Sequence, residues 1–244
     1  MRTDFSDSTA VKDIVVHHPQ TRLVLEKLGV DYCCSGNVPL AQAAQKAGLS
    51  AEQVLADLDQ ALGAAQTDAE AKDWTQTSLG ELADHIERTH HAFMKQQMPR
   101  LVGLLDKTLQ THGHRHGHML KKLKNAFISL KTDIDMHLVK EERILFPLIR
   151  QMDAYRQGQG PVPDVHCGTV AHPIGQMEFE HEQAGRFLAR IRTITSDFQL
   201  PDEACETFHA LYEGLRDLEA DLHEHIHLEN NVLFPKAVEA EAQM

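Results

Sequence analysis

The chain has 244 residues, 42% of them hydrophobic and 25% charged, which is the usual balance of a globular protein. Its formal net charge of −12 argues against nucleic acid and anionic membrane surfaces as partners, because both require a basic footprint. Two totals stand out. Histidine occurs 17 times, and only 5% of the residues are aromatic, which favours helices over a β-sandwich.

The sequence contains no recognisable signal for a membrane. Residues 1–7 are polar and acidic without the apolar core of a signal peptide, and no segment reaches the roughly 18 apolar residues of a membrane helix. We therefore expect a cytoplasmic protein with reduced thiols. Its four cysteines do not suggest a disulfide framework, since Cys33 and Cys34 are adjacent while Cys167 and Cys205 stand far apart.

Residues 1–62 predict a small helical domain, and residues 63–76, which are small and polar, predict a linker. Gly29 is a natural end for one of the short helices, and Ser50 is a natural cap for another. The loop 31–37 carries the adjacent cysteines. The expected helices cover residues 9–17, 21–28, 40–47 and the segment after Ser50.

Residues 77–244 predict long helices with a 3.6-residue period, and hence a four-helix bundle. Ser78 and Glu81 have the spacing of a capping box at the start of the first helix. The histidine- and glycine-rich residues 112–118 predict a break. The four helices are expected over residues 78–110, 119–152, 174–198 and 201–239.

Two segments of the bundle repeat the pattern H-x3-E-x3-L-F-P. One starts with His137 and Glu141, and the other, 88 residues later, starts with His225 and Glu229. Positions i and i+4 share one helix face, about 6 Å apart along the axis, so each pair can bind one metal ion or two adjacent ions. A single pair of this kind is commonplace on a solvated helix, but a repeat with the same Leu-Phe-Pro ending favours a metal site.

The helix before each repeat carries a lone histidine, His91 in the first copy and His181 in the second, 90 residues apart. Two copies of one helical hairpin around a pseudo-two-fold axis would supply four imidazoles and two carboxylates to one cavity. Glu142 and Glu180 lie next to these residues and can hydrogen-bond metal ligands, although exposed helix carboxylates are an equal reading.

Mixed imidazole and carboxylate ligands suit iron better than calcium or magnesium. Each carboxylate can bridge two ions, and two histidines on each ion leave room for an oxo or hydroxo bridge and an open position. A di-zinc site is the alternative, although structural zinc prefers a closed tetrahedral site. His112 lies 21 residues after His91, about 31 Å along one continuous helix, so we leave it out unless the chain folds back, for instance at Pro99.

The chain resembles a known family at these positions. Residues 77–244 resemble hemerythrin-like di-iron domains, and the whole chain resembles the di-iron iron–sulfur cluster repair proteins, or repair-of-iron-centres proteins. The resemblance rests on the two repeats, above all Glu229-Asn-Asn-Val-Leu-Phe-Pro235, and on the vicinal-cysteine loop Gly29-Val-Asp-Tyr-Cys33-Cys34-Ser-Gly36. The family loop is usually Cys-Cys-Gly-Gly, so Ser35 is a departure that restricts positive φ angles.

The resemblance implies a hemerythrin-like four-helix bundle preceded by a small helical domain, with two iron ions per chain and an oxo or hydroxo bridge. Glu141 and Glu229 would be the bridging carboxylates. Some family members are discussed with a further histidine, which aligns with His112; the rise of the helix argues against it. The implied ligands are His91, His137, Glu141, His181, His225 and Glu229.

The resemblance also implies a function, the repair of iron–sulfur clusters damaged by nitrosative or oxidative stress, by iron donation to the damaged proteins. Cys33 and Cys34 would then pass electrons or hold iron or nitric oxide in transit, unless they are two thiols in a turn without a redox role. Reduction of nitric oxide at the di-iron site and hemerythrin-like oxygen binding or sensing are the alternatives. No nucleic acid or membrane partner is expected, and a homodimer is left open.

Overall fold

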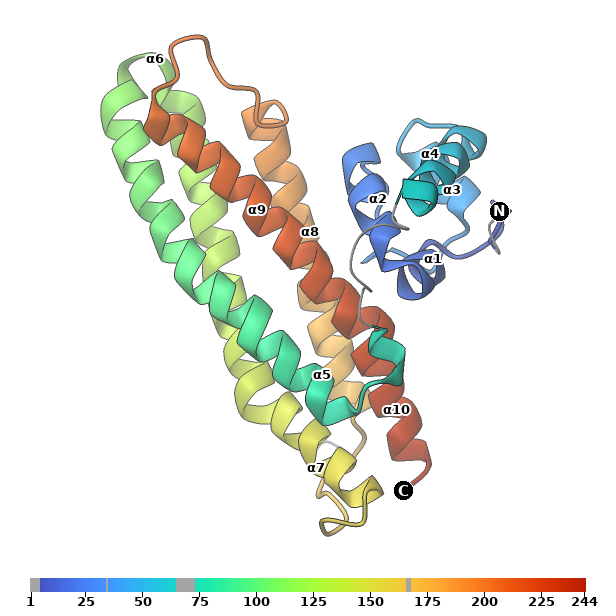
Figure 1. The fold of residues 1–244 in the computed structure, drawn as a ribbon. Helices are drawn as coiled ribbons and strands as arrows, with labels where there is room; N and C mark the ends of the chain where they lie inside the picture. The colour runs from blue at the N-terminus through green and yellow to red at the C-terminus, as the bar shows by residue number, and fades with distance from the viewer. Residues whose placement is uncertain (1–4, 34, 65–72, 166–167) are drawn as a thin grey trace. The chain divides into compact units, whose positions relative to one another are not determined.

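The computed structural model describes residues 5–33, 35–64, 73–165 and 168–244 (Figure 1). Among these residues the one β-type pairing is an isolated bridge between Ala10 and Pro39, and everything else that is regular is helical. The predicted all-α class with a hemerythrin-like bundle is therefore confirmed.

The chain divides into two compact units, each with its own buried core. The first unit joins Met1–Ser78 to Ile226–Lys236, and the second joins Leu79–His225 to Ala237–Met244. The expected domain limits at residues 62 and 77 stay a prediction. The first unit contains α1 (Val11–His17), η1 (Pro19–Thr21), α2 (Arg22–Leu28), α3 (Leu40–Lys46), α4 (Ala51–Ala64) and η3 (Trp74–Gln76).

The cysteine loop of the first unit depends on particular backbone positions. Gly29 ends α2 at φ 69°, a left-handed conformation that glycine adopts freely. Ser35 is not among the non-glycine residues of the described chain with positive φ, so serine fits where the family has glycine. Gly36 is constrained by space, because a Cβ atom there would lie 2.3 Å from the carbonyl oxygen of Tyr32.

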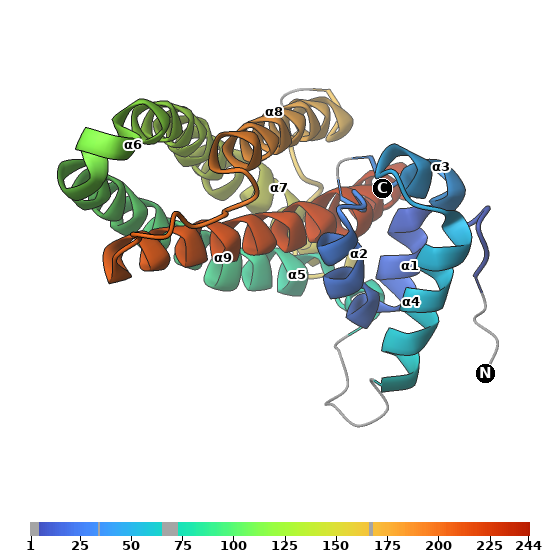
Figure 2. The same ribbon diagram turned by 90° about the horizontal axis from the view of Figure 1, so that it is seen from above.

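The second unit is a bundle in which α6 packs along α8 and α5 packs against α7 (Figures 1 and 2). Residues 206–242 are helical throughout, as α9, the π-helical turn η6 and α10. The helical elements from residue 79 onward are α5 (Leu79–Ile86), η4 (Glu87–His91), α6 (Ala92–Lys140), η5 (Glu141–Leu145), α7 (Phe146–Arg156), α8 (Ala171–Thr195), α9 (Glu206–Leu228), η6 (Glu229–Leu233) and α10 (Phe234–Ala242), of which η6 falls in the first unit.

Helix α6 differs from the prediction of a break at residues 112–118. These residues are helical, because the roughly 1 kcal/mol that each of Gly113 and Gly117 costs is offset by burial of neighbours such as Leu120. The chain nevertheless reverses within α6. Lys124 and Asp106 form an ion pair, although a straight helix would separate them by about 27 Å. Figures 1 and 2 show the two arms running side by side.

Three π-helical turns interrupt the long helices: η4, η5 and η6. Each turn carries one of the predicted ligands, namely His91, Glu141 or Glu229. The repeated Leu-Phe-Pro sequence falls where η5 and η6 end, and proline lacks the N–H that a regular helix would use there. The repeat therefore encodes a local widening of the helix, a feature that is frequent at functional sites.

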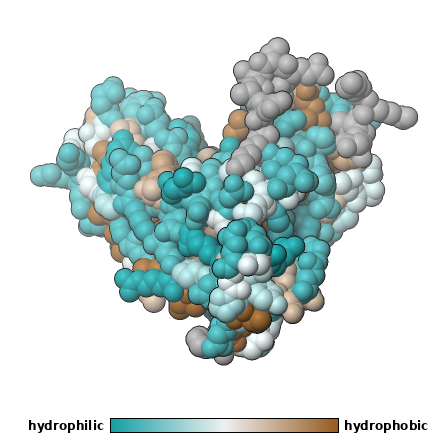
Figure 3. Space-filling view, turned by 60° about the horizontal axis from the view of Figure 1, so that its bottom comes forward, coloured by the Kyte–Doolittle hydropathy of each residue, from teal (hydrophilic) through white to brown (hydrophobic). Residues whose placement is uncertain are grey.

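The face in Figure 3 carries mainly hydrophilic side chains, with hydrophobic ones scattered among them. Within the described ranges, no helix combines the length and the apolar character needed to cross a lipid bilayer.

Gly36→Ala is expected to destabilise the first unit by about 1–3 kcal/mol, because its Cβ would clash with the Tyr32 backbone. The free energy of unfolding from denaturant titration measures the effect. Gly63→Ala in α4 is the matched control. A Cβ at Gly63 meets nothing within 4 Å, so this variant should gain up to about 1 kcal/mol. Equal effects of the two variants would contradict the packing described for the loop.

Candidate metal centre

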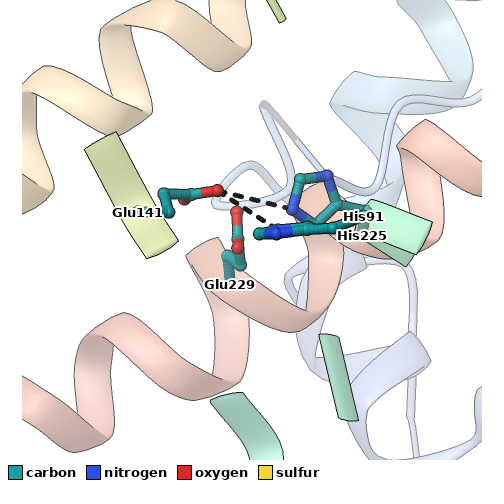
Figure 4. Close-up of side chains that lie close together, drawn as sticks. All are labelled: His91, Glu141, His225 and Glu229. Carbon is teal, nitrogen blue, oxygen red and sulfur yellow. Dashed lines mark ion pairs between the residues drawn. The ribbon is translucent and has the colours of Figure 1, made fainter. Parts of the chain in front are cut away.

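Six buried side chains of the bundle helices converge on one point. They form two groups, and within each group one donor atom per residue lies within 4.8 Å of all the others. Figure 4 shows the first group. The groups are His91, Glu141, His225 and Glu229, and His137, Glu141, His181 and Glu229. Both carboxylates belong to both groups, which is the arrangement that two adjacent cations would share.

The separations between donor atoms suit a common metal ion. Glu141 Oε2 lies 3.4 Å from His91 Nε2, 3.3 Å from His137 Nε2 and 3.9 Å from His225 Nε2. On the other side, the Nε2 atoms of His181 and His137 are 3.1 Å apart. Two donors that are each about 2.1 Å from one ion lie roughly 3 Å from each other, so these distances match neighbouring ligands.

Burial gives a second reason to expect cations. Each of the six residues is at most 1% exposed. Removing two carboxylates from water costs several kcal/mol per charge unless a positive charge offsets it. Metal cations are a counter-charge that fits this donor set of imidazoles and carboxylates.

The outer nitrogens of two imidazoles are held by carboxylates. His91 Nδ1 donates to Glu142 Oε1 at 2.9 Å, and His137 Nδ1 donates to Glu180 Oε2 at 3.0 Å. Donation through Nδ1 leaves the Nε2 lone pair directed at the cavity and fixes the ring. Glu142 and Glu180 thus hydrogen-bond two of the predicted ligands, and each reaches a histidine on a different helix from its own.

The side chains of Glu142 and Glu180 keep their negative charge. The hydrogen bond from His137, helped by Lys140 and Gln176, lowers the pKa of Glu180 to about 2 against the opposing effect of burial. Burial acts to raise the pKa of Glu142, but hydrogen bonds from Lys95 and His91 outweigh it, and the pKa falls below its ordinary value. Two anionic acceptors therefore face the imidazoles near neutral pH.

A further imidazole lies beside the centre. His90 is buried, its Nδ1 lies 2.9 Å from Asp221 Oδ1, and its ring stacks on His225 at 5.9 Å. His90 directly precedes His91, but the sequence patterns did not single out Asp221. The signal was present, because Asp221 precedes His225 by four residues and therefore shares its helix face.

His112 belongs to neither metal group in the described chain. Its Nε2 instead lies 3.2 Å from the Sγ atom of Cys205. The chain does fold back within α6, but this reversal brings His112 to Cys205 and not into either cluster of donors.

Of the two adjacent cysteines, Cys34 lies outside the described residues. Cys33 is buried in the core of the first unit. Asp31 caps the loop by accepting hydrogen bonds from the backbone N–H groups of Cys33 at 3.0 Å and Ser35 at 3.1 Å. This turn, in which an aspartate side chain closes its own loop, fixes the backbone around Cys33.

The cysteine loop is bound to the helical turn η6. Asn230 Nδ2 donates to the carbonyl of Cys33 at 3.4 Å, and Asn231 Nδ2 donates to the carbonyl of Tyr32 at 3.3 Å. Both asparagines directly follow Glu229 in the sequence. Within the first unit, the backbone next to the thiol is therefore attached to the turn that carries a shared carboxylate.

A helical bundle in which two histidine groups share two buried carboxylates defines a hemerythrin-like metal-binding protein. Residues 82–237 match the family model described as the Hemerythrin HHE cation binding domain. Residues 7–62 match a second model, described as a Domain of Unknown function (DUF542). The chain belongs to the family of the iron-sulfur cluster repair protein YtfE, in which both domains occur together.

The relatives span nearly the whole chain. Iron-sulfur cluster repair protein YtfE of Dickeya chrysanthemi (strain Ech1591) is 36% identical over 232 residues, covering 94% of this chain and 96% of the relative. The proteins of the same name from Pectobacterium carotovorum subsp. carotovorum (strain PC1) and Escherichia coli O157:H7 are 34% and 35% identical over 229 residues, with the same coverage. The similarity therefore includes both the cysteine loop and the metal centre.

Glu180→Gln is expected to weaken metal binding about 10- to 100-fold, because the neutral amide is a poorer acceptor for His137 Nδ1–H. Competition against a calibrated chelator measures the affinity. Glu178→Gln, the same change at an exposed position of α8, is the control and should leave the affinity unchanged. Equal affinities of the two variants would show that Glu180 does not support the ligand.

Proposed function

We propose that this chain repairs iron–sulfur clusters damaged by nitrosative or oxidative stress, by donating iron to the damaged proteins. The buried centre in which two histidine groups share Glu141 and Glu229 carries the proposal. The name that the relatives bear over 94% of the chain supports it. Damaged iron–sulfur proteins are accordingly the proposed clients.

The proposed cofactor is a pair of iron ions with an oxo or hydroxo bridge. His91 and His225 would hold one ion, His137 and His181 would hold the other, and the two glutamates would bridge them. Imidazole and carboxylate donors suit iron, which when bound supplies redox chemistry and a small number of exchangeable ligand positions. The protein residues themselves exclude water and fix the geometry.

The outer carboxylates give the centre a connection to solvent. The side chains of Glu142 and Glu180 are each 19% exposed, and they are paired with Lys95 and Lys140. The Nε2 atoms of the imidazoles lie in a buried site. The Nδ1 atoms of His91 and His137, by contrast, contact carboxylates that reach the surface. Iron can thus be held in a buried site while the hydrogen bonds that support two of its ligands are accessible from solvent. This arrangement suits a protein that releases iron better than one that stores it.

The thiols Cys33 and Cys34 are proposed to pass electrons to the irons, or to hold iron or nitric oxide in transit. The bonds from Asn230 and Asn231 to the loop support this role. Replacing both cysteines with serine should leave the iron bound and slow cluster repair. Loss of iron in this variant would instead make the thiols part of the metal site.

Reduction of nitric oxide at the same centre is the second candidate, favoured by the attachment of the thiol loop to the turn that carries Glu229. Incubation of the iron-loaded protein with a nitric oxide-damaged iron–sulfur enzyme separates the two functions. Repair predicts that enzyme activity returns as iron leaves the protein. Release of nitrous oxide over many turnovers, with the iron retained, would contradict donation and support the reductase.

Glu141→Ala and Glu229→Ala are each expected to lose most of the bound iron, because each removes a ligand shared by both groups. His112→Ala should retain the two irons, since His112 contacts Cys205. Metal analysis of the purified variants, with the ferric absorption bands as a second readout, tests this. Equal iron loss in all three variants would refute the ligand assignment.

A further inference from the structure

A second cluster of reactive side chains lies within the second unit, where α6 reverses and α9 begins. Its central contact joins His112 Nε2 and Cys205 Sγ at 3.2 Å. Cys205 is a free thiol and half-buried, whereas His112 is only 6% exposed. Neither residue takes part in the metal groups or in the proposed repair reaction.

Cys205 lies at the N-terminal end of α9. Its carbonyl accepts hydrogen bonds from the N–H groups of Phe208 at 2.8 Å and His209 at 3.0 Å, so it directly precedes the first turn of α9. The N-terminal end of a long helix stabilises negative charge, and cysteines placed there next to an imidazole are typical reactive thiols. The Phe208 ring lies against His112 at 5.3 Å and helps to hold the imidazole in place.

A buried polar atom on the same helix as His112 has no hydrogen-bond partner among the described residues. Thr108 is fully buried, and its Oγ1 atom makes no hydrogen bond within the described residues. Thr108 precedes His112 by four residues on α6 and therefore shares its helix face. A buried hydroxyl without a partner costs about 1–3 kcal/mol, and a small polar ligand next to the imidazole would satisfy it.

We propose that Cys205 is a peroxide-reactive thiol for which His112 is the base. His112 takes the thiol proton, and the sulfur attacks one oxygen of hydrogen peroxide. The S–O bond forms as the O–O bond breaks, and the leaving hydroxide takes the proton back from His112. The sulfur is oxidised by two electrons and the peroxide is reduced, so the products are cysteine sulfenic acid and water.

The chain supplies a matched control for this base. His116 lies one helical turn beyond His112 and also contacts Phe208. Its Nε2 is 3.1 Å from Glu203 Oε1, which also binds Arg115. His116 is therefore engaged with a carboxylate and not with the thiol, although it has the same chemistry and lies on the same segment.

The test uses the full-length, iron-loaded protein. Alkylation by iodoacetamide is followed at Cys205 by mass spectrometry of its peptide, in the native chain and in the His112→Gln and His116→Gln variants. We expect the rate at Cys205 to fall at least about tenfold in His112→Gln and to stay unchanged in His116→Gln. Dimedone added with hydrogen peroxide should trap sulfenic acid at Cys205, again less in His112→Gln.

Helix content and bound iron are measured on each variant, and the native rate at Cys205 is compared with that of free cysteine at the same pH. This comparison needs no variant, so misfolding of His112→Gln leaves the proposal testable. Equal rates in the native and His112→Gln proteins, or a native rate below that of free cysteine, would overturn the proposal. Rapid alkylation without a dimedone adduct would also overturn it, because the thiol would then not react with peroxide.

Discussion

Two carboxylates buried among four imidazoles are the constraint on which the rest of this structure depends. Glu141 and Glu229 are fully buried, and both belong to both histidine groups. Without cations, their charges would oppose folding by several kcal/mol each. With cations, the same residues join the arms of the bundle at its centre. Folding and metal binding are then linked, as expected for a site whose ligands come from separate helices.

The widened helical turns are the means by which the bundle accepts this centre. The turns η4, η5 and η6 each present a ligand, and two of them end at the repeated Leu-Phe-Pro. Each of these turns thus carries a predicted ligand together with the backbone irregularity that orients its side chain. The turn η6 has a second role, because Asn230 and Asn231 bind the backbone of the cysteine loop within the first unit.

The sequence was sufficient to predict the centre because its signal is local. Histidine and glutamate four residues apart must share a helix face, and the repeat places two such pairs on equivalent helices. The reversal of α6, by contrast, has no such short-range signal in the sequence. The composition of residues 112–118 is typical of a loop, yet these residues are helical. The ion pair between Lys124 and Asp106 shows that the chain folds back within α6.

Contacts between distant segments were the other part that no pattern predicted. The contact between His112 and Cys205 joins residues that spacing cannot relate, and spacing did not show which histidine Glu142 would bind. Ser35 shows the opposite case, in which a departure from the family pattern suggested strain that the backbone does not have.

X-ray absorption at the iron edge of the purified protein tests the central claim most directly. A shared pair of carboxylates predicts two irons per chain, about 3–4 Å apart, with nitrogen and oxygen donors only. Sulfur in the first coordination shell, or a single isolated iron, would contradict a centre built on Glu141 and Glu229.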